Sequence, residues 1–369
     1  MNKRSKRIPL YSRIHEYVRD QISNGVWRPG DRLPSENELA QQFQVSRITV
    51  KQAMSALVKE GMIYRIQGKG SFVSRGEEGE PAVFPPRVQP DFILNWVAFL
   101  LPSLDSSYTT HLLKGVEGAL AHAGYRLMFC RTSESPERES RLIAEMVQSG
   151  AKGIIIYPAE GESYNEEILR LTLNRYPIVV IDRYLKGVET NCVCSDHFGG
   201  ASRATSHLLQ LGHKKIAYLT TPYADTSSLE DRLEGYKHAL AEAMLPVEKR
   251  LIVTDLDKPR LVRFFHQNAD VTAVFAANAG IGLKAIDAIE EAGLRIPDQI
   301  SIVFFDTFEY AAYARVPPTS VVQQEEEIGR QAAELLLSVI EEPYRERQKI
   351  ILPPKLVLGR STGAPLKKP

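Results

Sequence analysis

The hydrophobic pattern of the chain changes near residue 93, and this change limits the fold more than any other feature. Before it, apolar residues recur at helical spacing in short segments. After it, apolar runs of strand length alternate with helical segments. Residues 76–92, between the two patterns, are charged and proline-rich, which is typical of a linker. We therefore expect one domain over residues 9–75, a linker over 76–92 and a second domain over 93–362.

The two parts of the chain differ in the sign of their charge. The formal net charge is only +1 over 369 residues, but residues 1–75 hold 14 Lys and Arg against 6 Asp and Glu. The rest of the chain holds 32 basic against 39 acidic residues. A basic part joined to an acidic part indicates that the basic part binds a polyanion. Charge alone leaves open the alternative of a merely solvated basic face.

Composition excludes several classes of protein. No apolar run approaches the roughly 18 residues of a membrane span, so we expect no membrane association. The basic residues 1–7 are not followed by an apolar segment, which argues against a signal peptide. The cysteines, Cys130, Cys192 and Cys194, are odd in number and do not form a disulfide or zinc pattern. The expected compartment is the cytoplasm, with no metal and no cofactor.

The sequence of the first domain predicts helices followed by a β-hairpin. Helical spacing over residues 10–22 ends at Asn24 and Gly25, and Ser35 with Glu38 forms a capping box for a helix over 36–43. Ser46 is a suitable N-cap for a third helix, whose apolar residues fall on one stripe from residue 50 to 58. Residues 63–66 and 71–73 flank a glycine-rich tip. This order predicts a winged helix-turn-helix.

The third helix has the arrangement of a recognition helix. Polar residues near its start lie largely off the apolar stripe, so they can enter a major groove while the stripe packs inward. Arg47 suits the O6 and N7 atoms of guanine, and Thr49 and Lys51 suit phosphates or base edges. Lys69 in the wing would lie along a minor groove.

Residues 9–75 closely resemble the GntR family of DNA-binding regulators. The resemblance is carried by residues 33–40 (Leu-Pro-Ser-Glu-Asn-Glu-Leu-Ala), 45–50 (Val-Ser-Arg-Ile-Thr-Val) and 68–70 (Gly-Lys-Gly). With Lys69 of the wing, it implies the following DNA contacts: Asn37, Ser46, Arg47, Thr49, Lys51, Gln67, Gly68 and Lys69. Purely structural roles remain open at single positions, since Ser46 is also an N-cap and Gly68 is also a turn residue.

In the second domain, predicted strands alternate with predicted helices, as in a doubly wound α/β fold. Apolar strands are expected at 97–101, 126–130, 153–157, 178–181, 215–219, 273–276 and 300–305, with helices between them, among them 107–122 and 136–148. Over nearly 270 residues, two parallel sheets are favoured over one. Ligands of such folds bind at the carboxyl ends of strands, here in a cleft between two lobes.

Residues suited to a polyhydroxylated ligand follow these strands. Asp182 and Asp306 each close a strand, Asn278 follows another, and Arg232 opens a helix. Such groups make paired hydrogen bonds to adjacent hydroxyls, and Tyr108 could stack on a sugar ring. The alternative roles are structural: Asp182 could only pair with Arg183, and Asp306 could only cap a turn.

Residues 93–362 resemble the effector domain of the LacI/GalR repressors, which has the fold of type I periplasmic binding proteins. The landmarks are residues 180–183 (Val-Ile-Asp-Arg), 211–217 (Leu-Gly-His-Lys-Lys-Ile-Ala), 232–236, 276–278, 296–303 and 317–321. The resemblance implies a homodimer and crossings between the lobes near 185–192, 307–310 and 320–323. It implies effector contacts at Tyr108, Asp182, Arg232, Asn278 and Asp306.

Two positions depart from that family. Ala279 stands where the family usually has Asp, and Phe304 stands where it usually has Gly. The first removes a carboxylate and the second is expected to place a ring beside the cleft, which would change ligand choice or abolish binding. A GntR-type DNA-binding domain joined to a LacI-type effector domain is the architecture of the bacterial arabinose repressors. This architecture favours a pentose as effector.

The function predicted from the sequence is a DNA-binding transcriptional regulator, a repressor of carbohydrate-metabolism genes, controlled by a small sugar-like effector. Its partners would be double-stranded operator DNA and the effector. The main rival is a DNA-binding protein whose large domain serves only dimerisation or protein contacts. We find no catalytic or nucleotide-binding motif and expect no enzyme activity. A transport solute-binding protein would share the fold of the second domain but would not need the basic residues 1–75.

Overall fold

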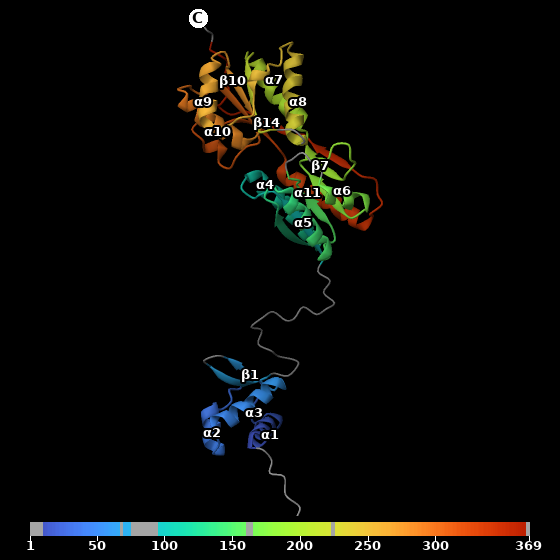
Figure 1. The fold of residues 1–369 in the computed structure, drawn as a ribbon, viewed down its shortest axis with the longest axis vertical. Helices are drawn as coiled ribbons and strands as arrows, with labels where there is room; N and C mark the ends of the chain where they lie inside the picture. The colour runs from blue at the N-terminus through green and yellow to red at the C-terminus, as the bar shows by residue number, and fades with distance from the viewer. Residues whose placement is uncertain (1–9, 67–68, 75–94, 160–164, 223–225, 367–369) are drawn as a thin grey trace, which may run out of the picture. The chain divides into compact units, whose positions relative to one another are not determined.

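The computed structural model describes residues 10–66, 69–74, 95–159, 165–222 and 226–366 (Figure 1). Its internal contacts divide the chain into two units, residues 1–93 and 94–369. Each unit has hydrophobic clusters of its own.

The first unit, the head, consists of helices followed by an antiparallel hairpin. Its elements are α1 (Leu10–Ser23), α2 (Glu36–Phe43), α3 (Arg47–Lys59), β1 (Ile63–Ile66) and β2 (Gly70–Val73). The prediction of a winged helix-turn-helix is confirmed. The tip residues Gln67 and Gly68 lie outside the described residues.

Local hydrogen bonds explain where α2 and α3 begin. The Ser35 hydroxyl accepts from the backbone N–H of Glu38 at 3.3 Å, and the Glu38 carboxylate accepts from the backbone N–H of Ser35 at 2.6 Å. Ser46 caps α3 by accepting from the backbone N–H of Thr49 at 3.3 Å. These caps satisfy amide groups that have no partner inside the helix. The buried side chains of α3, Val50, Ala53, Met54 and Leu57, then fix it against the rest of the head.

The second unit has two lobes, each a sheet with helices on both faces. We call the N-lobe the one whose parallel sheet has the strand order β13-β7-β6-β5-β3-β4. The strands are β3 (Trp96–Leu101), β4 (Arg126–Arg131), β5 (Ile154–Ile156), β6 (Ile178–Ile181), β7 (Cys192–Ser195) and β13 (Lys349–Leu352). The helices are α4 (Ser107–His122), α5 (Pro136–Gln148), α6 (Glu166–Leu173) and α11 (Glu325–Glu341).

Strand β3 shows why both faces of this sheet are covered. Val97 and Phe99 pack in one apolar cluster with α4 and α11, whereas Ala98 and Leu100 pack in a second cluster with α5 and α6. Successive side chains of a strand point to opposite faces, so a continuous apolar run requires helices on both sides.

The C-lobe has the strand order β14-β12-β11-β10-β8-β9, parallel except for the antiparallel edge strand β14. The strands are β8 (Ile216–Leu219), β9 (Ile252–Val253), β10 (Ala273–Ala276), β11 (Ser301–Phe305), β12 (Thr319–Val322) and β14 (Lys355–Val357). The helices are α7 (His197–Gln210), α8 (Ser227–Glu242), α9 (Lys258–Gln267) and α10 (Ala279–Glu291), with short turns η2 (Lys249–Leu251) and η3 (Ala311–Tyr313). Figure 1 shows α7 to α10 around this lobe and α4, α5, α6 and α11 around the other.

The positions of the lobe crossings differ from the prediction. Within the described residues the chain crosses three times: between β7 and α7, between β12 and α11, and between β13 and β14. The crossing expected near 320–323 is close to the second of these. Those expected near 185–192 and 307–310 are wrong, because β7 still pairs with β6 in the N-lobe and β12 still pairs with β11 in the C-lobe.

The predicted fold class, a winged helix-turn-helix plus a two-lobed doubly wound parallel-sheet domain, is confirmed. The helices at 107–122 and 136–148 have the expected bounds, and each expected strand agrees within one residue at either end. The carboxyl ends of β5 and β6 in the N-lobe are followed by Tyr157 and Asp182, and those of β10 and β11 in the C-lobe by Asn278 and Asp306.

Candidate functional site

The exposed face of α3 starts at the first residue of the helix. Arg47, Ile48, Lys51 and Gln52 are exposed, whereas Val50 is completely buried. Because the buried stripe holds α3 in the head, the exposed side chains face outward as a set. This is the arrangement by which a recognition helix enters a major groove.

Glu36 on α2 holds two basic side chains of the head. Its Oε2 accepts from Arg47 Nε at 3.1 Å, and its Oε1 lies 3.2 Å from Arg65 Nη2 on β1. The Glu36 side chain is 20% exposed and that of Arg47 is 69% exposed. The carboxylate therefore orients Arg47 at the start of α3. Sequence reasoning missed Glu36 and Arg65, since these contacts join separate elements.

Six of the eight residues expected to contact DNA lie in the described residues. Ser46 and Thr49 are joined by a 2.9 Å contact between their hydroxyls at the start of α3. Asn37 is exposed on α2 and Lys69 is exposed just before β2. Gln67 and Gly68 lie outside the described residues, so their positions stay predictions.

A cavity of about 300 Å³ lies between the two lobes of the second unit. Its N-lobe wall includes Tyr108, and its C-lobe wall includes Arg232, Asn278 and Asp306. The structure therefore brings together four of the five residues expected to bind an effector. The wall also contains Glu134 and Tyr157, which sequence reasoning missed, and Arg183, which it named only together with Asp182.

Asp182, the fifth expected residue, lies behind this wall. Its Oδ1 accepts from the Tyr108 hydroxyl at 2.5 Å and lies 3.6 Å from Nε2 of His197. Asp182 is only 1% exposed and does not line the cavity. The alternative role for Asp182, as an ion-pair partner of Arg183 only, does not describe these contacts. Arg183 Nη1 donates to the Pro158 carbonyl at 2.7 Å instead.

The charge state of this buried group follows from its neighbours. Burial works to raise the pKa of Asp182, but the nearby His197, the guanidinium groups of Arg232 and Arg183 and the hydrogen bond from Tyr108 together outweigh burial and hold that pKa below its ordinary value. Burial lowers the pKa of His197 to about 4, and the nearby Arg232 adds to the effect. A neutral His197 beside an ionised Asp182 is thus the favoured arrangement near neutral pH.

Arg232 on α8 is fixed from several sides. Its Nη1 donates to the Ala277 carbonyl at 2.7 Å and lies 3.5 Å from Oδ2 of Asp306. Its guanidinium carbon lies 3.8 Å from the centre of the Phe305 ring, a cation–π contact. Such fixing pre-orients the guanidinium at the cavity wall.

Asp306 is held by Gln323, which directly follows β12. Its Oδ1 accepts from Gln323 Nε2 at 2.5 Å, and burial raises the pKa of Asp306 despite the nearby Arg232. Within the described residues, Gln323 Oε1 is buried and has no hydrogen-bond partner. Gln323 does not line the cavity, so it positions the Asp306 carboxylate from behind the wall.

Asn278 serves two purposes at the start of α10. Its side-chain oxygen accepts from the backbone N–H of Ile281 at 2.8 Å and so caps the helix. The side chain is also part of the cavity wall, where its amide nitrogen can donate to a ligand.

The two departures from the LacI pattern have different consequences. Ala279 lines the cavity, as expected. The expectation for Phe304 is wrong: its ring is fully buried and does not line the cavity. A Cβ atom on Gly282 of α10 would lie 2.6 Å from this ring, so Phe304 fills the space beneath α10 rather than the cleft.

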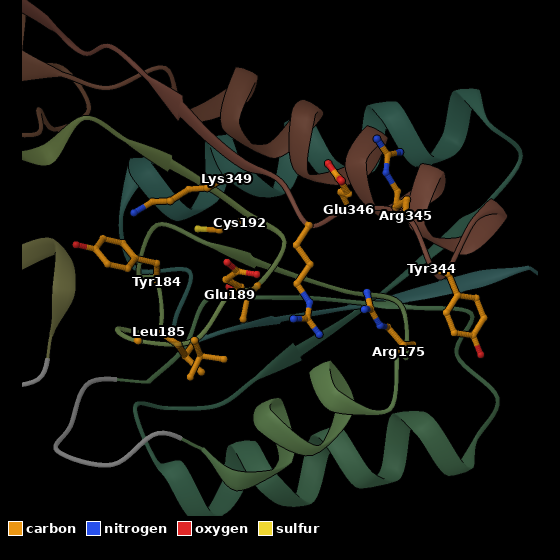
Figure 2. A pocket seen from close by; sticks show the side chains of 13 residues that line it. Arg175, Tyr184, Leu185, Glu189, Cys192, Tyr344, Arg345, Glu346 and Lys349 are labelled. Carbon is orange, nitrogen blue, oxygen red and sulfur yellow. The ribbon is translucent and has the colours of Figure 1, made fainter.

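A second, larger cavity of about 860 Å³ lies on the N-lobe, between the segment 184–192 and the segment 344–349 (Figure 2). Lys349 points to the ring of Tyr184, with Nζ 3.3 Å from the ring centre. The Tyr184 hydroxyl donates to Asp231 on α8 of the C-lobe, at 3.0 Å to Oδ1. Tyr184 is therefore a contact between the lobes, and its partner Asp231 precedes Arg232 in the chain.

The described residues give no sign of a metal centre or a membrane span. They contain no group of His, Cys, Asp and Glu that could hold a metal ion. The cysteines at 130, 192 and 194 are free, and the last two are buried in β7. No described helix is both long enough and apolar enough to span a bilayer.

Comparison with known proteins assigns both parts of the chain to families. Residues 10–73 match the model of bacterial regulatory proteins of the gntR family, and residues 205–362 match the periplasmic binding protein-like domain. An arabinose metabolism transcriptional repressor from Geobacillus stearothermophilus is 32% identical, over 97% of this chain and 99% of that protein. One from Halalkalibacterium halodurans is 29% identical over 96% of each chain.

A solved structure extends the comparison to the lobes. A LacI family transcriptional regulator from Enterococcus faecium with bound ribose matches with a TM-score of 0.62 and 26% identity. The match covers 73% of this chain and 99% of that chain.

Proposed function

The chain belongs to the GntR family of bacterial transcriptional regulators, in the group with a LacI-type periplasmic-binding-protein-like domain, and we propose that it is a sugar-released repressor. Two relatives, which match 97% and 96% of the chain, are named as arabinose metabolism transcriptional repressors. The observation that carries the proposal is the cavity between the lobes, whose polar wall residues come from both lobes. The chain acts by binding DNA and a small ligand, not as an enzyme, and works in the cytoplasm.

The head contacts operator DNA through α3, the start of α2 and the wing. The residues in this role are Asn37, Ser46, Arg47, Thr49, Lys51, Gln67, Gly68 and Lys69. Two heads of a homodimer, formed through residues 93–362, bind the half-sites of a palindromic operator. Arg47→Ala removes a guanidinium that Glu36 already orients, so specific operator binding is lost while the fold is kept. Unchanged operator affinity in this variant would remove Arg47 from the recognition role.

The ligand is a small neutral sugar, with a pentose as the first candidate. A cavity of about 300 Å³ is at the small end for ligand sites. Its wall has carboxylates from Glu134 and Asp306 and guanidinium groups from Arg183 and Arg232, so opposite charges balance. Such a wall suits hydroxyl groups better than a phosphate, which would need an excess of positive charge. The ribose in the related Enterococcus faecium structure supports the size class.

The ligand acts by changing the geometry of the lobes. It contacts Tyr108, Arg232, Asn278 and Asp306, draws the lobes together and shifts the dimer to a form that no longer spaces the heads for the operator. Asp182 supports this site through Tyr108. By thermodynamic linkage, DNA and sugar weaken each other's binding by the same factor.

The rival function, a second domain used only for dimerisation or protein contacts, is favoured by one observation. Ala279 lines the cavity where related domains usually have a carboxylate. Against it stand Arg232 and Asp306, two charged side chains that are held in place at the cavity wall.

Thermal unfolding of the full-length protein with a panel of sugars separates these proposals. The panel contains L-arabinose, D-ribose, D-glucose and the corresponding sugar phosphates. A pentose at 100 times its Kd should stabilise the native state by about 2.7 kcal/mol, and Arg47→Ala should show the same shift because it lies in the head. Stabilisation by phosphates alone would contradict the neutral-sugar class, and no stabilisation by any compound would favour the rival.

A further inference from the structure

Ile48 is an apolar side chain on the polar face of α3. It is the second residue of the helix, and it is 78% exposed. Its exposed neighbours on this face are Arg47, Lys51 and Gln52, while the apolar stripe of α3 is buried on the opposite side. Ile48 therefore does not contribute to the core of the head.

The position of Ile48 places it in whatever groove receives Arg47. The two residues are adjacent on the first turn of α3, and the N-terminal residues of a recognition helix meet base edges. An isoleucine side chain makes no hydrogen bonds, so it gains nothing from donors, acceptors or phosphates in that groove. In the major groove the apolar group that distinguishes base pairs is the C5-methyl of thymine.

We infer that Ile48 contacts the C5-methyl group of a thymine in the operator and is a specificity-determining residue of the head. The inference rests on the proposed DNA binding and adds a base preference to it. A β-branched side chain in a helix is largely restricted to one χ1 rotamer, so Ile48 presents its methyl groups in a defined direction before DNA arrives. Little side-chain entropy is then lost on contact.

Replacing thymine by uracil in the operator tests this contact, because the change removes the methyl group and nothing else. The operator is first obtained by selecting random duplexes on the full-length protein. Each dT of the selected duplex is then replaced singly by dU, and Kd is measured by fluorescence anisotropy at fixed salt. At the contacted dT the Kd of the wild-type protein should rise about fourfold, the worth of one buried methyl group.

Two variants make the test specific. Ile48→Ala should lose most of the difference between the dT and dU operators at that position. Val58→Ala, which shortens another exposed β-branched residue near the end of α3, should keep it. Circular dichroism confirms that both variants are folded.

The inference is overturned if no dU substitution changes the affinity of the wild-type protein, or if Ile48→Ala shows the same penalty as the wild type. A selection that enriches no sequence at all would overturn the proposed DNA-binding function as well. The two failures are therefore distinguishable.

Discussion

Two aspartates occupy matching positions in the two lobes, and their surroundings differ. Asp182 follows β6 in the N-lobe and Asp306 follows β11 in the C-lobe. Both have left-handed backbone conformations, with φ of 63° and 67°. Each backbone N–H donates to a neighbouring strand, at 3.0 Å to the Val193 carbonyl and 2.9 Å to the Val321 carbonyl.

The side chains of this pair have separate roles. The Asp182 side chain is 1% exposed, lies behind Tyr108 and has a lowered pKa. The Asp306 side chain is 14% exposed, lies on the cavity wall and has a pKa raised by burial. The same backbone position thus provides a support in one lobe and a ligand contact in the other. The comparison predicts that changes at Asp182 affect stability most and that changes at Asp306 affect binding most.

Asp182→Ala should have the largest effect on stability. It leaves the positive charge of Arg232 and Arg183 without a buried carboxylate, and it frees the Tyr108 hydroxyl from its acceptor. Leaving a buried hydrogen-bond donor without its acceptor costs about 1–3 kcal/mol, and the lost attraction to the nearby guanidinium groups adds to this cost. Thermal unfolding of the second unit should therefore occur at clearly lower temperature than in the wild type. The matched control is Asp298→Ala on the C-lobe surface, and equal melting of both variants would contradict the supporting role.

Asp306→Asn should instead weaken sugar binding with little loss of stability. A hydrogen bond to a charged group is worth about 1.5–3 kcal/mol, so affinity for L-arabinose should fall about tenfold or more. The free protein should melt at the same or a higher temperature, because a carboxylate that resists ionisation in the fold has been removed. Isothermal titration calorimetry measures the affinity. Wild-type affinity in this variant would remove Asp306 from the site.

The two aspartates should also give opposite pH dependences. The pKa of Asp182 is lowered on folding, so its stabilisation is complete above the ordinary value of 3.8 and is lost as pH falls through the folded pKa. The pKa of Asp306 is raised, so its ionisation costs stability above the folded pKa, and this cost is relieved as pH falls through it.

Urea unfolding at a series of pH values measures this contrast. On acidification the wild type should gain stability relative to Asp306→Asn, and it should lose stability relative to Asp182→Asn only below about pH 4. Parallel curves for the two variants would show that the environments of the two carboxyls are alike, and the separate roles of the two aspartates would then be wrong.

Tyr184→Phe should have the smallest effect. It removes the hydroxyl that joins the N-lobe to Asp231 on α8 and leaves the ring beneath Lys349. A part-buried hydrogen bond to a carboxylate is worth about 1.5 kcal/mol, at the low end for bonds to charged groups, so L-arabinose affinity should fall by about tenfold at most. Tyr344→Phe, an exposed tyrosine at the same cavity, should leave the affinity unchanged (Figure 2). Equal affinities in both variants would show that the Tyr184–Asp231 contact does not favour closure of the lobes.

Features encoded over a few residues could be predicted from the sequence. Ser35 with Glu38, and Ser46 with Thr49, are separated by one helical turn, so their capping contacts follow from spacing. The strands of the second unit are apolar runs, and the residues that follow them lie at the carboxyl edge of a sheet wherever the strands pair in parallel. This placed Asp306 and Asn278 near the cavity.

Features that depend on distant residues could not be predicted. Asp182 and Tyr108 are 74 positions apart, and the side-chain direction that hides Asp182 behind the ring depends on the packing of both lobes. Glu36 and Arg47 meet across two helices. Two of the three lobe crossings could not be predicted, because the short strands β7 and β12 carry no signal that says which sheet they join.

Operator affinity measured with and without L-arabinose tests most directly whether the cavity controls DNA binding. Sugar bound in the cavity should raise the Kd of the wild-type protein for its selected operator about tenfold or more. Asp306→Asn should bind the same operator with wild-type affinity and should not be released at that sugar concentration. If L-arabinose stabilises the wild-type protein while its operator Kd stays the same, the cavity does not control DNA binding and the protein is not a sugar-released repressor.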